Sequence, residues 1–408
     1  MRKIFFIVIF AQLLRLSAGG ITWQEVLSQA ADRSNEIKSA RKQLDAYRWT
    51  YYKAYSNFLP QLSANFSAGE ASGSSSGVSN SVAWGISATQ YLFKGLGNYN
   101  NLRSAGVNYD LYRANLQNTE ADFYYNARLA FIDLYLARQN VSVRKKIRQY
   151  RADNTRMIKL FYDSGTEDKG NYLRTKAQLA EAEYNVVSAG RRLELARLKL
   201  AQLIVGDAAS AEGEMKAAAV VSLPDIDVLT KSSPAYLMAK DQLELAAIAE
   251  QNTLSEFLPS VSLNGSYQKS GSAWPPSSLG KSLSLNVSLP IFPGGANFAD
   301  RAIAGFQLDK AREDFAKNQK DIYFGIKEAY SNLNDAIGAY AVQKDYLNAS
   351  RERARIAQAK YLSGLITYDE WDRLQNEYIS NQSNLLNSEK SALAAEAGWH
   401  KAYGGYIK

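Results

Sequence analysis

The chain repeats itself at one fixed offset. Pro60, which ends a Phe-Leu-Pro tripeptide, returns as Pro259, 199 positions later. Other residues that return at this offset include Gln43, Leu44, Phe58, Leu59, Ser63, Asn65, Phe93, Gly95, Ser164, Gly165 and Gly206. Agreement at a single offset without gaps favours a duplicated structural unit over coincidence. We therefore expect one repeat at residues 21–206, a linker at 207–228 and a second repeat at 229–408.

Each repeat has two segments in which apolar and small polar residues alternate, which is typical of strands with two different faces. The clearest segment runs from Leu283 to Ile291. Pro290 and Pro293 cannot donate to a strand ladder, and the glycine pair after them permits a turn, so this strand must end there. We expect strands at about 60–68, 82–93, 259–268 and 282–292, with exposed loops at 69–81 and 270–281.

The rest of each repeat has helical periodicity. In the first repeat we expect one continuous helix over 22–57, a long helix over 97–162, a turn at 163–171 and a return helix over 172–205. In the second repeat the helices are expected at 233–256, 299–362 and 369–402, with a turn at Gly364. The long helices would each reach on the order of 100 Å, and a helix of that length needs a packing partner along it.

The first 20 residues have the pattern of a secretory signal peptide. Arg2 and Lys3 precede an apolar run from Ile4 to Leu14, and small residues follow at 17–20. The apolar run is too short to cross a bilayer as a helix, and no other stretch is long and apolar enough. Any insertion of the mature chain into a membrane must therefore be by strands.

The composition argues against catalytic residues, a metal site or a cofactor site. The sequence has no cysteine, which excludes disulfides, thiolate ligands and a cysteine-linked lipid anchor. His400 is its only histidine, and we expect it on the surface near the C-terminus. No phosphate-binding glycine loop and no Ser/His/Asp arrangement occurs. The formal net charge of +8 is too small and too evenly spread to indicate nucleic acid.

The number of strands constrains assembly. Single-chain membrane barrels begin at roughly eight strands, whereas each repeat supplies only a pair. An open edge in a membrane leaves backbone groups unpaired at a cost of several kcal/mol each. Two, three or four chains must therefore contribute, with the serine and asparagine face lining the pore. A soluble sandwich is the alternative, but the long helices and the two-faced strands weigh against it.

Several motifs together resemble the TolC-like outer membrane efflux protein family. They are the repeated order of helix, strand pair and long helix, the Phe-Leu-Pro entry to the strands, the segment Leu289 to Gly295, and Tyr361-x-x-Gly364-Leu365-Ile366-Thr367-Tyr368 followed by Asp-x-x-Asp. The resemblance covers essentially the whole mature chain. It implies a mainly α fold with a membrane β-barrel, in which a homotrimer forms a 12-stranded barrel in the outer membrane lipid and a long α-helical barrel in the periplasm.

The resemblance also implies a function. The protein would be the passive outer membrane exit duct of a tripartite efflux or type I secretion system. A periplasmic adaptor protein would open it, and an inner-membrane transporter would supply the energy. The exported substrate is not encoded in these patterns.

In the family, acidic residues just past the second hairpin tip form the periplasmic gate. Asp369 and Asp372 fit that pattern here, and three copies of each at the pore mouth would attract cations. A structural role is equally open. Thr367 and Glu370 have the spacing of a capping box, and acidic residues in a first turn complement the helix dipole with or without a pore.

The resemblance places the adaptor contact at the two hairpin tips. The tip residues are Ser164, Gly165, Thr166, Ser363, Gly364, Leu365, Ile366 and Thr367. Leu365 and Ile366 form an apolar pair in a turn that we expect to face solvent. They would anchor the helices of a partner or pack against a neighbouring tip.

A second function accounts for part of the same pattern. A trimeric coiled-coil stalk, anchored in the envelope by a small barrel and serving a structural or adhesive role, would share the long helices and the strands. It would not require a gapless duplication or hairpin tips, and it would not conduct ions.

Overall fold

The computed structural model describes residues 21–73, 77–204, 215 and 222–407. The predicted signal peptide and most of the predicted linker lie outside these described residues. Within the described part of the chain, no helix combines the length and the apolar character needed to cross a membrane.

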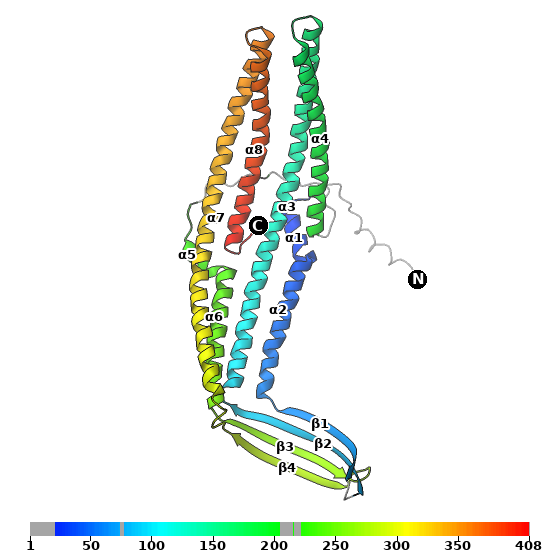
Figure 1. The fold of residues 1–408 in the computed structure, drawn as a ribbon, viewed down its shortest axis with the longest axis vertical. Coiled ribbons are helices and arrows are strands. Elements are labelled where there is room, and N and C mark those ends of the chain that lie inside the picture. The colour runs from blue at the N-terminus through cyan, green and yellow to red at the C-terminus, as the bar shows by residue number, and fades with distance from the viewer. Residues whose placement is uncertain (1–20, 74–76, 205–214, 216–221, 408) are drawn as a thin grey trace, which may run out of the picture. The chain divides into compact units, whose positions relative to one another are not determined.

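The two longest helices show the duplication most clearly (Figure 1). Helix α3 (Gly97–Asp163) and helix α7 (Ala296–Leu362) each have 67 residues and begin 199 positions apart. Each is followed by a shorter return helix, α4 (Lys169–Ile204) after α3 and α8 (Tyr368–Ala402) after α7. The predicted long helices and return helices are present, with ends that differ from the expected ones by at most three residues.

Each repeat begins with a broken helix, which corrects the prediction of one continuous helix over 22–57. The first repeat has α1 (Trp23–Arg33) and α2 (Asn35–Ala54), and the second has α5 (Ile226–Ser232) and α6 (Pro234–Asn252). A short 3-10 turn follows each, at Tyr55–Phe58 and Thr253–Phe257. Helix α5 was missed because its first residues fall in the predicted linker.

A buried serine stands at each break. The Ser34 hydroxyl accepts the backbone N–H of Ile37 at 3.3 Å, and the Ser233 hydroxyl accepts that of Tyr236 at 3.3 Å. Both serines are at most 2% exposed and lie 199 positions apart. Because these side chains satisfy amides that a continuous helix would bond internally, they start a new helix at the same place in each repeat.

Removing either serine hydroxyl is expected to destabilise the fold. Ser34→Ala and Ser233→Ala should each lower the free energy of unfolding by about 1 kcal/mol, because each leaves a helix-start amide without its acceptor. Urea unfolding followed by circular dichroism measures the change. Ser34→Thr and Ser233→Thr, which keep the hydroxyl, are the controls; equal losses in the threonine and alanine variants would contradict a capping role.

The four strands form one antiparallel sheet in the order β1-β2-β3-β4. They are β1 (Gln61–Gly73), β2 (Gly77–Lys94), β3 (Ser260–Gly271) and β4 (Ser278–Ser288). Most of the predicted loop at 69–81 is therefore strand, because β1 and β2 pair as far as Gly73 and Gly77. Strand β4 ends earlier than predicted, at Ser288, since Pro290 cannot donate and β4 pairs on one side only.

The chain divides into two compact units that do not coincide with the repeats. Unit 1 comprises Met1–Lys38, Thr119–Leu229 and Phe324–Lys408, and unit 2 comprises Ser39–Asn118 and Thr230–Tyr323. Unit 2 contains the sheet. Unit 1 contains the return helices and a core of large apolar side chains, among them Phe131, Ile132, Leu134 and Leu200.

His400 is half-buried in unit 1, which corrects its predicted place on the surface. Its Nδ1 atom is hydrogen-bonded to the Tyr403 hydroxyl. Burial lowers the pKa of His400 below its ordinary value, and the charge of Arg128 lowers it further. The fold therefore favours the neutral form of this imidazole.

The stability of unit 1 is expected to fall as the pH drops below about 6.5. In the interval between the lowered folded pKa of His400 and its unfolded pKa, the unfolded chain binds more protons, so stability rises with pH across this interval and levels off above it. His400→Gln should flatten the dependence. Melting temperatures of both proteins between pH 5 and 8 test this, and parallel curves would show that His400 is not the cause. Glu396 would act in the opposite direction, because burial raises its pKa in the folded chain.

Candidate functional site

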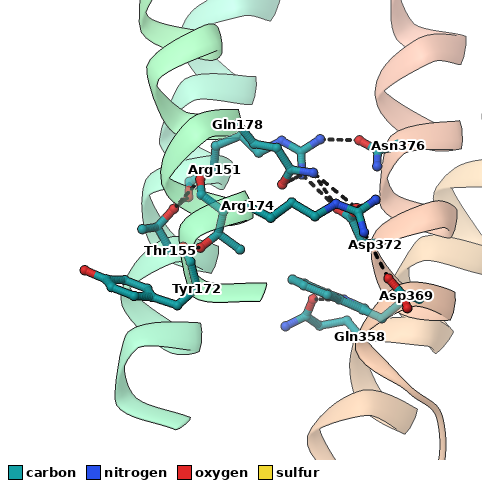
Figure 2. A network of polar contacts seen from close by, with 11 residues as sticks. Arg151, Thr155, Tyr172, Arg174, Gln178, Gln358, Asp369, Asp372 and Asn376 are labelled. Atoms are coloured by element: carbon teal, nitrogen blue, oxygen red, sulfur yellow. Dashed lines mark hydrogen bonds and ion pairs between the residues drawn. The ribbon is translucent and has the colours of Figure 1, made fainter. Parts of the chain in front are cut away.

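The two predicted gate aspartates lie in the first turns of α8 but in different environments. Asp372 is fully buried, whereas the Asp369 side chain is 79% exposed. Figure 2 shows both facing side chains from α3 and α4, which form the other hairpin of unit 1. The Asp-x-x-Asp spacing therefore brings one carboxylate into the protein interior and leaves the other at its surface.

Asp372 is bound from two helices. Arg174 of α4 approaches one carboxylate oxygen at 3.0 Å, and Arg151 of α3 approaches the other at 3.4 Å. Gln178 of α4 donates to both oxygens at 3.1 Å. Arg174 also bonds Asp369 at 2.9 Å. We call Arg151, Arg174, Gln178, Asp369 and Asp372 the tip cluster.

The tip cluster joins the α3–α4 hairpin to α8 through charges that cancel. Arg151 is 7% exposed and also donates to Gln178 and to Asn376. A buried ion pair stays stable only when further hydrogen bonds satisfy its remaining polar atoms, and removal of one partner then costs about 3–5 kcal/mol. The exposed contact between Arg174 and Asp369 contributes about 0–1 kcal/mol. Loss of Asp372 is therefore expected to cost more than loss of Asp369.

An aromatic layer lies beside the tip cluster, on α7 and α8. Tyr361 stacks on Trp371 with ring centroids 4.9 Å apart, and Tyr368 is tilted against Trp371 at 5.6 Å. The Trp371 indole donates to Gln358 at 2.8 Å. Burial raises the pKa of both tyrosines, so their hydroxyls stay protonated.

Tyr361 ties this layer to the first hairpin. Its hydroxyl donates to Glu167 at 2.6 Å, which is a charge-assisted hydrogen bond between α7 and the turn before α4. Tyr361→Phe is expected to lower the free energy of unfolding of unit 1 by roughly 1.5–3 kcal/mol, since it removes that bond and keeps the ring. Thermal unfolding measures the loss. Glu167→Gln, which keeps a neutral acceptor, should cost less, and an equal cost would contradict the charge assistance.

The two hairpin turns have the same backbone geometry. Gly165 and Gly364 adopt positive φ angles of 79° and 72°. In each turn the next residue donates its N–H five residues back, from Thr166 to Phe161 and from Leu365 to Lys360, both at 2.9 Å. This is a Schellman-type helix end, which requires a residue that tolerates positive φ and so explains the repeated glycine.

The tip side chains have separate roles. The hydroxyls of Ser164 and Thr166 both donate a hydrogen bond to the backbone carbonyl of Phe161, within the first turn. Ser363 donates to Ala359. Leu365 is 73% exposed, as predicted, but Ile366 is partly buried against the cluster of Ile158, Ala357, Tyr368 and Trp371. The expectation of an exposed apolar pair is therefore wrong for Ile366, which packs within its own chain.

The structural alternative for the acidic turn is present as well. Thr367 caps α8, and its hydroxyl accepts the N–H of Glu370 at 3.3 Å. Asp369 and Glu370 are the acidic residues of the first turn.

The described residues contain no group of three or more potential metal-ligating His, Cys, Asp and Glu side chains.

The sheet has two faces of different chemistry. On one face, side chains of the four strands form neutral polar rows, one of which is Ser63, Ser87, Ser266 and Ser282. The outer pairs of this row are hydrogen-bonded at 2.7 Å. The opposite face carries exposed apolar side chains, including Leu62, Phe66, Leu283, Leu285 and Val287, which are 60–77% exposed. A sheet with a bare apolar face and a polar face fits a boundary between lipid and water.

Sequence comparison identifies the family. The sequence model described as outer membrane efflux protein matches residues 26–206 and 225–405, two segments that also begin 199 positions apart. The outer membrane efflux protein BepC of Brucella suis biovar 1 is 24% identical over 367 residues, which cover 84% of this chain and 76% of that protein.

Solved structures agree on the fold. CusC has a TM-score of 0.86 at 16% identity, covering 94% of this chain and 92% of that chain. The CmeC outer membrane channel of Campylobacter jejuni has a TM-score of 0.83 at 15% identity, covering 94% and 86%. The open state of the MtrE outer membrane channel of Neisseria gonorrhoeae has a TM-score of 0.81 at 20% identity, covering 94% and 89%.

These findings confirm the resemblance and the predicted fold class. The matched segments cover most of the chain, so the chain belongs to the outer membrane efflux protein family, and its fold is that of solved outer membrane channels.

Proposed function

We propose that three copies of this chain form a passive efflux duct, whose strands close one sheet of twelve strands across the outer membrane and whose helical hairpins extend into the periplasm. The observation that carries the proposal is the two-faced sheet. Its hydroxyl and amide rows would line the water-filled passage, and its exposed apolar face would contact lipid. The edge strands β1 and β4 are each unpaired on one side, which a closed ring of copies would correct.

The periplasmic entrance would be closed by the hairpin tips. The tip cluster and the bond between Tyr361 and Glu167 hold the α3–α4 hairpin to the α7–α8 hairpin in one chain. Opening would require these contacts to break. Because two arginines balance Asp369 and Asp372, the cluster carries no net charge while closed, and the aspartates would favour cations only after the arginines move away.

The energy and the opening signal would come from partners. A periplasmic adaptor would dock on the two glycine turns, with the exposed Leu365 as an apolar anchor, and an inner-membrane transporter would drive export. BepC is described as an outer membrane efflux protein, which supports export as the role of this chain.

Single-channel recording in a planar bilayer tests the duct. Purified wild-type protein should show a small conductance without an adaptor, because the tip cluster keeps the entrance closed most of the time. Correctly folded, inserted protein that never conducts, even after the tip cluster is disrupted, would overturn the duct and favour the envelope-anchored stalk.

A further inference from the structure

The duplication extends to the pairing of the strands. Every residue pair between β3 and β4 is the image of a pair between β1 and β2, displaced by 199 positions. Gln61 faces Thr89, for example, and Ser260 faces Ser288. The two hairpins of the sheet are therefore in identical register, although few of the paired residues are identical.

This rule predicts how one copy joins the next. Within the chain, β2 pairs with β3, and Ile86 faces Tyr267. The residue 199 positions after Ile86 is Leu285 on β4, and the residue 199 positions before Tyr267 is Ala68 on β1. Strands β4 and β1 are the two free edges of the sheet. We propose that β4 of one copy pairs antiparallel with β1 of the neighbouring copy in the register that sets Leu285 opposite Ala68. The number of copies rests on the proposed duct, but the register does not.

We call the proposed contact between β4 of one copy and β1 of the next the joint. The register keeps the two faces of the sheet continuous across it. It sets Val287 opposite Phe66 on the apolar face, and Asn286 opposite Ser67 on the polar face. A slip of one residue would turn polar side chains toward the apolar face. The joint stops short of the helices, because Pro290 occupies the position equivalent to Tyr91 and has no N–H to donate.

The same register brings opposite charges together. Leu283 would face Glu70 of the neighbouring copy, which makes Lys281 the diagonal neighbour of that carboxylate on one face of the sheet, within reach of a long side chain. Both side chains are exposed, and neither forms an ion pair among the described residues. Lys281 instead lies over the Tyr267 ring at 5.7 Å and is a diagonal neighbour of another cation, Lys269.

The charges are specific to the joint between copies. At the equivalent joint inside the chain, Lys269 occupies the place of Glu70 and Val82 the place of Lys281, so no opposite charges meet there. Pairing of β4 with another β4 would offer Lys281 no carboxylate, because β4 contains no acidic residue. The ion pair between Glu70 and Lys281 therefore favours head-to-tail closure over the wrong pairing of like edges.

Cysteine cross-linking tests the register directly, because the chain has no cysteine of its own. The double variant Leu285→Cys/Ala68→Cys should give covalent oligomers after mild oxidation in outer membranes. Residues directly opposite each other on paired strands lie as close together as a disulfide requires. Leu285→Cys/Phe66→Cys is the matched control for a slip of two residues. Faster linking in that control, or linking by Leu285→Cys alone, would overturn the proposed register.

Charge exchange tests the ion pair. Glu70→Lys and Lys281→Glu should each speed dissociation of the oligomer in detergent by roughly threefold, and the double exchange should restore the wild-type rate. Glu70→Lys with Lys320→Glu, an exposed lysine on α7, keeps the same net charge and should not restore it. No rescue by the double exchange would overturn the pair. None of these readouts requires conductance, so a cross-linked oligomer that fails to conduct would count against the duct alone.

Discussion

Asp372→Ala is expected to raise the open-to-closed ratio of the channel by roughly 150-fold or more, whereas Asp369→Ala should change it by less than about fivefold. Asp372 is buried and contacts two arginines, so its loss leaves buried positive charge without its counterion and would destabilise the proposed closed state by about 3 kcal/mol or more. Asp369 is exposed, and Arg174 keeps Asp372 when Asp369 is lost. Single-channel open probability in a planar bilayer measures both effects.

Two further variants separate this explanation from simpler ones. Asp372→Asn keeps the shape and a hydrogen-bond acceptor and removes the charge, so it should fall between Asp372→Ala and wild type. Glu370→Ala removes an acidic residue of the same first turn that lies outside the tip cluster, and it reports any effect of the helix dipole. Equal opening by Asp369→Ala and Asp372→Ala, or by Glu370→Ala, would show that the buried ion pair does not close the entrance.

The order of helices and strands along the chain was predictable because the sequence contains the same unit twice. The length of α3 and α7 followed from an unbroken helical pattern bounded by glycines, although the start of α7 was expected at 299 and lies at Ala296. The break at Ser34 was not predicted, because a serine inside a helical pattern is common and only burial makes its hydroxyl a cap. The helix start at Ser233 was predicted, but the short helix α5 before it was not. The early end of β4 reflects Pro290, which the sequence shows, together with a missing strand neighbour, which no local pattern reveals.

The tip cluster was predictable only in part. Motif spacing singled out Asp369 and Asp372 but could not tell which carboxylate is buried, since both occupy the start of the same helix. Their partners Arg151 and Gln178 lie about 200 positions away in sequence and on another hairpin. One signal was available for Arg174: its equivalent in the second repeat is Arg373, the residue next to Asp372, so the duplication places Arg174 within one residue of the depth of Asp372.

The second large effect is expected from arginine substitutions on the two faces of β4. Leu285→Arg should reduce the amount of assembled protein in the outer membrane severely, because an arginine on the lipid-facing side near the bilayer centre costs about 2–4 kcal/mol in each copy. Asn286→Arg, one residue later, should assemble normally, because its side chain lies on the polar face, opposite Ser262. Quantified oligomer in outer membrane fractions and the reversal potential in a salt gradient measure the two outcomes.

The expected consequence of Asn286→Arg is a shift toward anion selectivity. The polar rows of the described strands are neutral, so the added guanidinium of each copy would supply the charge on that part of the passage wall. Leu285→Gln is the matched control for Leu285→Arg, since it adds polarity without charge and should assemble better. If Leu285→Arg instead assembled and changed selectivity while Asn286→Arg blocked assembly, the apolar face would line the passage. The proposed orientation of the sheet would then be reversed.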